Sequence, residues 1–392
     1  MKMPRNRYIL LIIAAIINFP SGSAAIWSVF QPYAMEYFGV EMGIANMPFS
    51  VYMAMFVIGN IVGGYLQSKL KPKVVVYICS GVMCLGFLLT GVVPSQWFWG
   101  VSVTYGILGG MGSGAVYNVI LATISKWFLE RKGFASGIVV CVVGANGFIM
   151  SPVCNKLLND FGFSKAMLIV GVIYFIIINL GVWTIHEPDA VAIQKIKSVN
   201  VFGVEEKNYT AKQMVKQKKF YMISGAMAFC MVPYFMISPM LKTLGMQRGL
   251  SETLAVTTVM TLAVMNCAGR LIATSLSDKF GRKSILSLLL LISMVSVLGL
   301  TRVEHIGYII CTGLVALCYG GFFGIFPVVS LEQFGSKNAG LNYGIIMIGY
   351  GVVSLICPFL VNIGIKVALM LAAISCVLGM ALISFALKND KN

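Results

Sequence analysis

The chain has 392 residues, of which 58% are hydrophobic and only 11% are charged, and its mean hydropathy is +0.89. About a quarter of the residues of a soluble domain are charged, so this composition excludes a soluble domain and indicates a protein whose solvent is lipid. The formal net charge of +16 is compatible with nucleic-acid binding only until the basic residues are assigned to the short segments between apolar runs. We therefore expect a lipid bilayer, and no nucleic acid, as the partner.

The apolar runs predict an all-α membrane protein with twelve transmembrane helices. A helix needs about 20 apolar residues to cross the hydrocarbon core of a bilayer. In chain order, the predicted spans cover residues 8–33, 44–66, 74–93, 97–125, 134–155, 165–185, 220–244, 254–277, 284–300, 306–331, 339–361 and 367–387. An even number of spans places both termini on one side of the membrane.

The basic residues predict which side that is. With the N-terminus inside, 22 of the 29 Lys and Arg residues fall in inner segments and six in outer loops, which leaves Arg270 alone at membrane depth. Cytoplasmic loops carry the excess of Lys and Arg in membrane proteins. We therefore expect a multi-pass protein of the cell (plasma) membrane with both termini in the cytoplasm. Lys242 and Lys366, near the outer mouth, would attract anions by long-range steering.

The chain divides into two halves of one design. Residues 187–219 form the only long polar stretch, which predicts a cytoplasmic linker between an N-terminal six-helix bundle at 1–186 and a C-terminal one at 220–392. Landmarks recur at an offset of 206–210 residues, in the pairs Pro32 and Pro239, Gly39 and Gly245, Ser68 and Asp278, Gly110 and Gly320, and Pro152 and Pro358. Such pseudo-symmetric duplication is typical of secondary transporters, whose substrate site lies near the midplane between the halves.

The glycines of GILGGMGSGAVYN, at 106–118, lie inside an apolar run with no preceding strand. They therefore predict close approach of membrane helices and not a nucleotide-binding loop.

Residues for enzyme or metal chemistry are scarce in the predicted spans. The only histidines are His186 and His305, at a helix end and in a loop, and all ten cysteines lie within spans without a CxxC pair. No Asp, Glu or His lies deep in any span. We therefore expect no metal site, no cofactor, no disulfide and no enzyme activity. A membrane enzyme or a non-transporting sensor on a similar scaffold stays an alternative.

Arg270 stands in the run MNCAGRLIATSLSDKFGRK, with no other charge before Asp278. A guanidinium on a membrane helix costs a few kcal/mol, so it is retained where it faces a polar cavity or a ligand. Arg270 lies eight residues before Asp278, or about 12 Å of helix from the inner surface. The alternative is a side chain that snorkels to that surface, and at this depth its reach is marginal. The forked donors of arginine suit a carboxylate, so we interpret Arg270 as an anion anchor.

Several blocks of the sequence resemble known transporter motifs. LSDKFGRK, at 276–283, resembles the loop signature of the major facilitator superfamily, and GGYLQSKLKPK, at 63–73, repeats it in decayed form. IWSVFQ, GSGAVYN, SKWFLERKGFASGI, NCAGR and FGSKNAGLNYGI resemble blocks of the oxalate:formate antiporter family in the same order. The resemblance covers nearly the whole chain. It implies a secondary carrier that moves small carboxylates by alternating access and is related to proton-coupled monocarboxylate transporters.

The resemblance also implies substrate-binding residues. Arg270 matches the arginine with which the family holds the substrate carboxylate, and Asn266 stands where proton-coupled relatives have an aspartate. The other matching positions are Gln31, Tyr117, Tyr319, Phe323 and Tyr350, the last standing where oxalate-type members have a second cation. Helix packing is an equal alternative for each aromatic residue, as is a bond to a neighbouring helix for Asn266.

These positions favour a short monocarboxylate such as formate over oxalate, because one deep cation is present where a dicarboxylate would need two. They also favour carboxylate exchange over proton symport, because no acid lies on the intramembrane path. The motif residues Asp278, Lys279, Gly281 and Arg282 predict a conformational latch, with Asp278 facing the positive N-terminal end of the fifth span near Phe134. Ser68, the counterpart of Asp278, has no charge for this contact. We expect a monomer.

Overall fold

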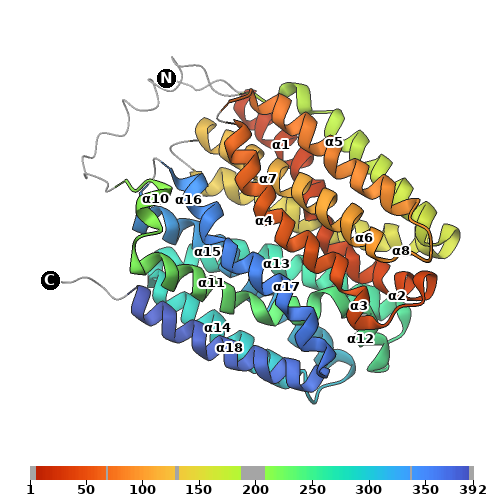
Figure 1. The fold of residues 1–392 in the computed structure, drawn as a ribbon. Helices are drawn as coiled ribbons and strands as arrows, with labels where there is room; N and C mark the ends of the chain where they lie inside the picture. The colour runs from red at the N-terminus through yellow and green to blue at the C-terminus, as the bar shows by residue number, and fades with distance from the viewer. Residues whose placement is uncertain (1–5, 68, 129–131, 187–207, 336–337, 388–392) are drawn as a thin grey trace.

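The structure, a computed structural model, describes residues 6–67, 69–128, 132–186, 208–335 and 338–387. Every regular element within these ranges is a helix. Figure 1 shows two groups of helices side by side, the N-terminal half in red to yellow-green and the C-terminal half in green to blue. The predicted linker at 187–219 lies mostly outside the described residues, and α11 begins at Lys218.

The N-terminal half contains α1 (Asn6–Asn18), η1 (Phe19–Ile26), α2 (Trp27–Phe38), α3 (Met42–Ala45), α4 (Met47–Gln67), α5 (Pro72–Gly91), α6 (Trp99–Val101), η2 (Ser102–Gly109), α7 (Gly110–Trp127), α8 (Lys132–Asn179) and η4 (Val182–Thr184). The C-terminal half contains α10 (Ala211–Met214), α11 (Lys218–Ile237), η5 (Ser238–Met240), α12 (Leu241–Gln247), α13 (Glu252–Phe280), α14 (Arg282–Gly299), α15 (His305–Phe334), α16 (Ala339–Ile346), α17 (Ile348–Asn362) and α18 (Ile365–Ala386).

These elements form the twelve expected spans. Ten described helical segments are long and apolar enough to cross a bilayer, and one of them, Gly137–Thr184, has 48 residues. This segment is twice the length a span needs, so it accounts for spans five and six. The shorter apolar helix Leu341–Cys357 belongs to span eleven. The prediction of an all-α protein with twelve membrane helices is therefore confirmed.

Several predicted boundaries were wrong. The connection expected at 156–164 is shorter than predicted, because α8 consists of two helices that meet at Gly162, whose φ of 73° and ψ of 179° are not helical. Glycine tolerates this positive φ at little cost. The first span is not one continuous α-helix, since the segment FPSGSAAI forms the 3₁₀ helix η1 between α1 and α2. Span eleven is likewise divided at Met347 into α16 and α17.

Glycines bring equivalent pairs of helices into contact in the two halves. A Cβ atom on Gly110 of α7 would lie 2.4 Å from the carbonyl oxygen of Tyr52 on α4. A Cβ atom on its repeat counterpart, Gly320 of α15, would lie 2.0 Å from the carbonyl oxygen of Asn266 on α13. Small residues at such crossings let membrane helices approach closely, as the sequence predicted. In the C-terminal half this contact fixes the backbone that carries Asn266 and Arg270.

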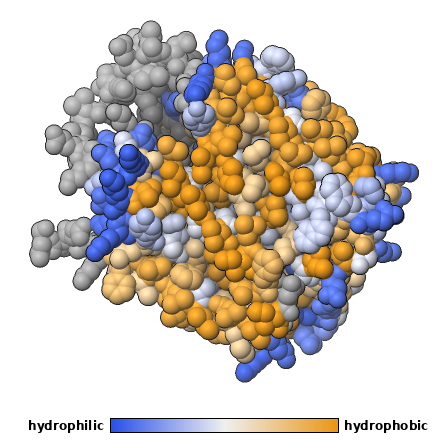
Figure 2. All heavy atoms as spheres, in the orientation of Figure 1, coloured by the Kyte–Doolittle hydropathy of each residue, from blue (hydrophilic) through white to orange (hydrophobic). Residues whose placement is uncertain are grey.

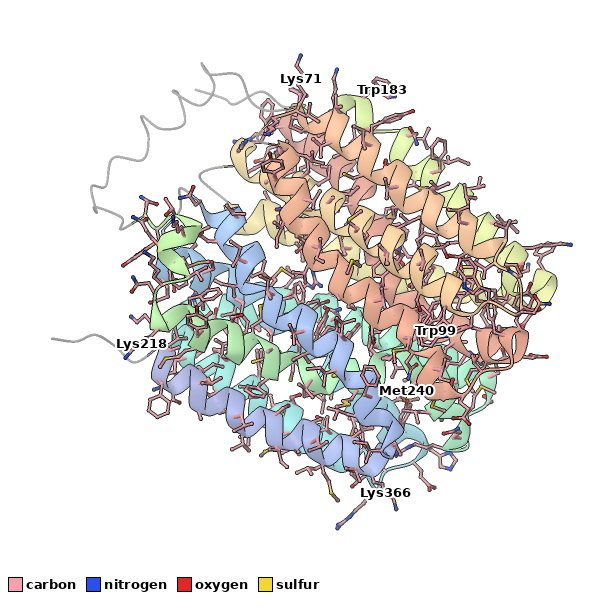
Figure 3. The ribbon with its side chains drawn as sticks, in the orientation of Figure 1. Lys71, Trp99, Trp183, Lys218, Met240 and Lys366 are labelled. Carbon is pink, nitrogen blue, oxygen red and sulfur yellow. The ribbon has the colours of Figure 1, made fainter. Side chains whose placement is uncertain are left out.

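The surface has the pattern expected for a membrane protein. Figure 2 shows a broad apolar belt across the helices, with hydrophilic side chains gathered towards the two ends of the bundle. Trp99 and Trp183 lie towards opposite ends in Figure 3, and 57% and 72% of their side-chain surfaces are exposed. Tryptophan favours the two interfaces between lipid and water, so these residues mark the edges of the belt.

Candidate functional site

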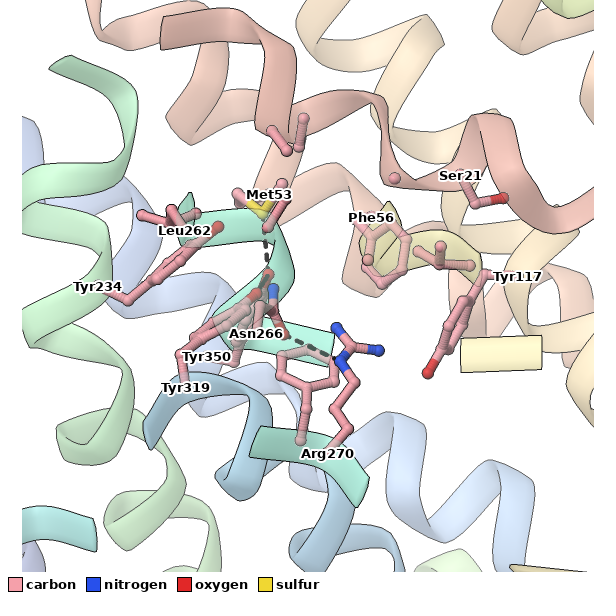
Figure 4. Close-up of a pocket in the computed structure, with 17 residues that line it drawn as sticks. Ser21, Met53, Phe56, Tyr117, Tyr234, Leu262, Asn266, Arg270, Tyr319 and Tyr350 are labelled. Carbon is pink, nitrogen blue, oxygen red and sulfur yellow. Dashed lines mark hydrogen bonds between the residues drawn. The ribbon is translucent and has the colours of Figure 1, made fainter. Parts of the chain in front are cut away.

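A cavity lies between the two halves, halfway along the helices. Its walls come from η1, α4, α7 and α8 of the N-terminal half and from α11, α13, α15 and α17 of the C-terminal half. Its volume is about 60 Å³. Figure 4 shows the Arg270 guanidinium entering this space from α13, with Asn266 beside it and Tyr117 across from it. A single cation therefore faces a cavity whose other walls are apolar, aromatic or neutral.

Arg270 is 8% exposed and has neutral partners. Its Nε donates to Asn266 Oδ1 at 3.0 Å, and one terminal nitrogen, Nη1, donates to the Val140 carbonyl oxygen of α8 at 3.3 Å. Its guanidinium carbon lies 5.2 Å from the centre of the Phe323 ring, which is a cation–π distance. No carboxylate of the described residues pairs with it. The charge is thus oriented by the protein without being neutralised.

Asn266 bonds Arg270, which lies four residues further on in the same helix. The sequence left two alternatives for this amide, a neighbouring helix or the substrate, and neither included Arg270. The spacing of i and i+4 places both side chains on one face of α13. Because the amide oxygen accepts from Nε, the planar fork of Arg270 has a preferred orientation in the cavity.

The wall on the C-terminal side is aromatic. Tyr234 of α11 stacks on Tyr319 of α15, with ring centres 3.6 Å apart and planes 10° apart. The Tyr319 and Tyr350 hydroxyl oxygens lie 3.2 Å apart, and Tyr350 donates to Met53 Sδ of the other half at 2.8 Å. Phe323 completes this wall, with its ring centre 5.5 Å from that of Tyr350.

The structure brings together six of the seven residues that the sequence named as substrate-binding. Asn266, Arg270, Tyr117, Tyr319, Phe323 and Tyr350 all line the cavity. Sequence reasoning missed Tyr234. The repeat could have found it, because the offset of 206–210 residues maps Tyr234 onto residues 24–28, and η1 lines the cavity at Ala24 and Ala25.

Gln31 is the residue that does not join the cavity. It is fully buried on α2, where its Nε2 donates to Asn46 Oδ1 at 2.6 Å and its Oε1 accepts from the Thr243 hydroxyl of α12 at 2.5 Å. The second bond crosses between the halves. The signal for this role was absent from the sequence, because the partners are 212 positions apart.

Lys242, next to Thr243, is also in this contact region. Lys242 was expected to attract anions to the outer mouth by long-range steering, but it is 1% exposed. Its Nζ donates to Asn155 Oδ1 of α8 at 2.7 Å and pairs with Glu252 at 2.8 Å, and it lies 4.8 Å from the centre of the Tyr33 ring. These contacts lie at the end of the bundle remote from the chain termini (Figure 1). We call the group formed by Gln31, Tyr33, Asn155, Thr243, Lys242 and Glu252 the distal seal.

The predicted latch residues lie at the other end of α13. Asp278 pairs with Arg282 at 2.5 Å, and Arg282 also reaches Glu332 of α15 at 3.2 Å, so these ion pairs stay within the C-terminal half. Gly281 makes the turn from α13 to α14 with φ of 84°, and Lys279 is exposed. The side chains at the start of α8, as well as Ser68, lie outside the described residues, so the contact expected for Asp278 stays a prediction. No group of three or more His, Cys, Asp or Glu side chains that could hold a metal occurs in the described ranges.

Two halves of six helices around a central cavity are typical of membrane transporters. The chain matches the model of the Major Facilitator Superfamily over residues 11–358, and it belongs to this superfamily. The superfamily expected from the loop motif is thereby confirmed.

Three similar proteins are distant relatives of this chain. The uncharacterized MFS-type transporter YhjX of Escherichia coli is 27% identical over 361 residues, which cover 90% of this chain and 86% of that protein. The oxalate:formate antiporter of Oxalobacter formigenes is 22% identical over 393 residues, or 97% of this chain and 92% of that protein. Monocarboxylate transporter 13 of Rattus norvegicus is 29% identical over 132 residues, or 34% of this chain and 30% of that protein.

Proposed function

We propose that this transporter moves short monocarboxylates, such as formate, and that it exchanges one carboxylate for another. The observation that carries the proposal is Arg270, a buried cation in a central cavity whose partners are all neutral. A cation that is desolvated without a counter-ion is costly, and a bound carboxylate would remove that cost. The names of the oxalate:formate antiporter and of monocarboxylate transporter 13 support the same class of substrate.

The size of the cavity favours a small ligand. A single water needs about 10–15 Å³ of such space, so a cavity of about 60 Å³ holds roughly four waters. A carboxylate with one or two carbons fits this volume without rearrangement of the walls. Larger anions would have to displace Tyr234, Tyr319 or Tyr350, whose stacking and hydroxyl contacts hold them in place.

The charge of the cavity favours a monoanion. Tyr350 occupies the position at which the resemblance to oxalate-type members called for a second cation, and its hydroxyl is engaged with Tyr319 and Met53. A second carboxylate would therefore be desolvated against neutral rings without a charged partner. We therefore expect oxalate to bind more weakly than formate.

The proposal of carboxylate exchange rests on the uncompensated charge of Arg270. In the empty carrier Arg270 would be buried without a counter-ion each time the halves close, whereas the loaded carrier would be compensated. Reorientation should therefore be fast only when a carboxylate is bound. Asn266, which holds Arg270, is an amide and carries no proton between the two sides. We further propose, from the distribution of Lys and Arg, that the protein is in the cell membrane with both termini cytoplasmic, and that it has no enzyme activity.

The test uses the purified full-length carrier in lipid vesicles. Labelled formate, acetate and oxalate are offered to vesicles preloaded with unlabelled formate and to empty vesicles with an inward proton gradient. We expect uptake only into preloaded vesicles, with formate favoured over oxalate. Concentrative uptake into empty vesicles would establish proton symport, and equal uptake of oxalate would contradict the monoanion preference.

The matched pair of variants is Arg270→Ala and Arg302→Ala, the latter being an exposed arginine outside the cavity. Hydrogen bonds to charged groups contribute about 1.5–3 kcal/mol each, so Arg270→Ala should lower the affinity for formate roughly 10- to 100-fold. Arg302→Ala should transport normally. Wild-type affinity in Arg270→Ala would remove the basis of the proposal.

A further inference from the structure

Two cysteines face each other across the seam between the halves. Cys141 lies on α8 and Cys267 on α13, and the Cys267 Sγ donates to the Cys141 carbonyl oxygen at 3.1 Å. The two cysteines are therefore in direct contact. They are 126 positions apart in the sequence, and none of the transport chemistry described above uses them.

The helices that carry these cysteines pass unusually close to each other. A Cβ atom on Gly144, one turn after Cys141, would lie 2.6 Å from Cys267 Sγ and 3.9 Å from Cys267 Cα. A disulfide requires Cα atoms about 4.4–6.8 Å apart. Cys141 is one turn from this closest approach, so we expect a small adjustment of the two helices to bring the cysteine pair into that range. The absence of a side chain on Gly144 is what leaves room for the Cys267 sulfur.

The pair lies beside the substrate cavity, next to two of its lining residues, Gly144 and Asn266. Cys141 and Cys267 are both partly exposed. Of the other described cysteines only Cys311 shares this partial exposure, and the rest are buried. A small neutral oxidant that reaches the seam beside the cavity would therefore find two partly exposed thiols at one place.

We propose that Cys141 and Cys267 form an oxidation site at which a hydroperoxide staples the two halves together and arrests transport. In the first step one thiol sulfur attacks the peroxide oxygen, which forms a sulfenic acid and releases an alcohol, or water from hydrogen peroxide. The second thiol then attacks the sulfenic sulfur and releases water, which leaves the disulfide. The two thiols together lose two electrons and two protons, and the O–O bond of the peroxide is reduced.

The arrest follows from where the bond would form. The Cys141–Cys267 contact and the bond from Arg270 to Val140 both join α8 to α13, and these helices belong to opposite halves. Alternating access moves one half against the other around the central site. A covalent bond in this seam would hold the pair of helices at one separation, and a thiol reductant would release them.

The cross-link is measured directly in the full-length chain with a protease site introduced into the 187–219 segment. After treatment with hydrogen peroxide, alkylation of free thiols and cleavage, non-reducing gels should show one band for the wild type and two bands for Cys141→Ser and for Cys267→Ser. Mass spectrometry should find the peptides of Cys141 and Cys267 joined. Two bands from the oxidised wild type would overturn the proposal, whatever the substrate of the carrier proves to be.

Transport supplies the second readout, in the uncut protein. Peroxide should lower wild-type exchange at least tenfold, and dithiothreitol should restore it. Cys141→Ser and Cys267→Ser should keep exchange within about twofold of wild type before oxidation and should resist peroxide, with Cys141→Ala and Cys267→Ala as replacements if a serine variant is misfolded. Cys311→Ser is the matched control and should stay sensitive. Loss of activity on oxidation of Cys267→Ser, or full exchange by the cross-linked wild type, would refute the arrest.

Discussion

Arg270 and Asn266 form a side-chain hydrogen bond within one turn of α13, from Nε to Oδ1 at 3.0 Å. The amide orients the guanidinium without neutralising it. The cavity therefore keeps its positive charge, and we propose that this neutral acceptor keeps a proton out of the transport cycle.

Asn266→Asp should couple the carrier to protons. The new carboxylate would pair with Arg270 when it is ionised, so affinity for formate at neutral pH should fall roughly tenfold or more. At acidic pH protonation of that carboxylate would free Arg270, so affinity should recover as pH falls. Uptake at the two pH values measures the effect. Asn266→Leu removes the acceptor without adding a charge, so its loss of affinity for formate should be similar at the two pH values. A formate affinity of Asn266→Asp that does not change with pH would contradict this account.

Tyr350→Lys should shift the preference towards dicarboxylates. A cation at this place in the aromatic wall would offset the desolvation of a second carboxylate, and a monoanion would leave it unpaired. We expect the ratio of oxalate to formate affinity to rise about tenfold, measured by competition against labelled formate. Tyr350→Phe keeps the ring and loses the bonds to Tyr319 and Met53, so it should retain the monoanion preference. If the ratio of oxalate to formate affinity does not change in Tyr350→Lys, the second carboxylate of oxalate does not bind near this position.

Lys242→Met should open the distal seal. The substitution removes the bond to Asn155 of the other half and the ion pair with Glu252, whose side chain is 44% exposed and can be solvated instead. The parent protein lacks Cys141 and Cys267 and carries a reporter cysteine in place of Leu262, in the cavity wall. An impermeant maleimide added on that side should label the reporter several-fold faster when Lys242→Met is added to this parent.

The control for the seal is Lys366→Met, which removes an exposed lysine of the same half at the same end of the bundle (Figure 3). Its labelling rate should equal that of the parent. If both lysine variants raise the rate equally, the effect is one of surface charge and the seal has no part in it.

The end of the bundle near the termini should depend on Asp278 more than on Ser68. Asp278 carries a charge that can interact with the N-terminal end of α8, and Ser68 carries none. The exposed pair of Asp278 and Arg282 contributes at most about 1 kcal/mol, so Asp278→Asn should fold normally. We expect Asp278→Asn, and not Ser68→Ala, to raise maleimide labelling of the cavity from this end. Equal effects of the two variants would show that the latch is symmetric.

The sequence was sufficient for the membrane class, the number of spans and the repeat. The thickness of the bilayer sets the minimum length of each apolar run. A cation at membrane depth costs free energy, so Arg270 could be named as a candidate site residue without a structure. The sequence was insufficient for the turn at Gly162 between spans five and six and for the 3₁₀ helix η1 inside span one, because both change local geometry without changing hydropathy.

Only the tertiary structure decided which polar residues serve the cavity and which hold the halves together. Gln31 and Tyr117 were equal candidates in the sequence, yet Gln31 bonds Thr243 in the distal seal and Tyr117 lines the cavity. Lysine usually lies at the surface, yet Lys242 is buried and bonds Asn155 of another helix. The physical reason is that the mean hydropathy of a span averages over all its side chains and indicates only that the span lies in lipid. A side chain's role depends instead on the few atoms that the packing of distant helices brings within hydrogen-bonding distance.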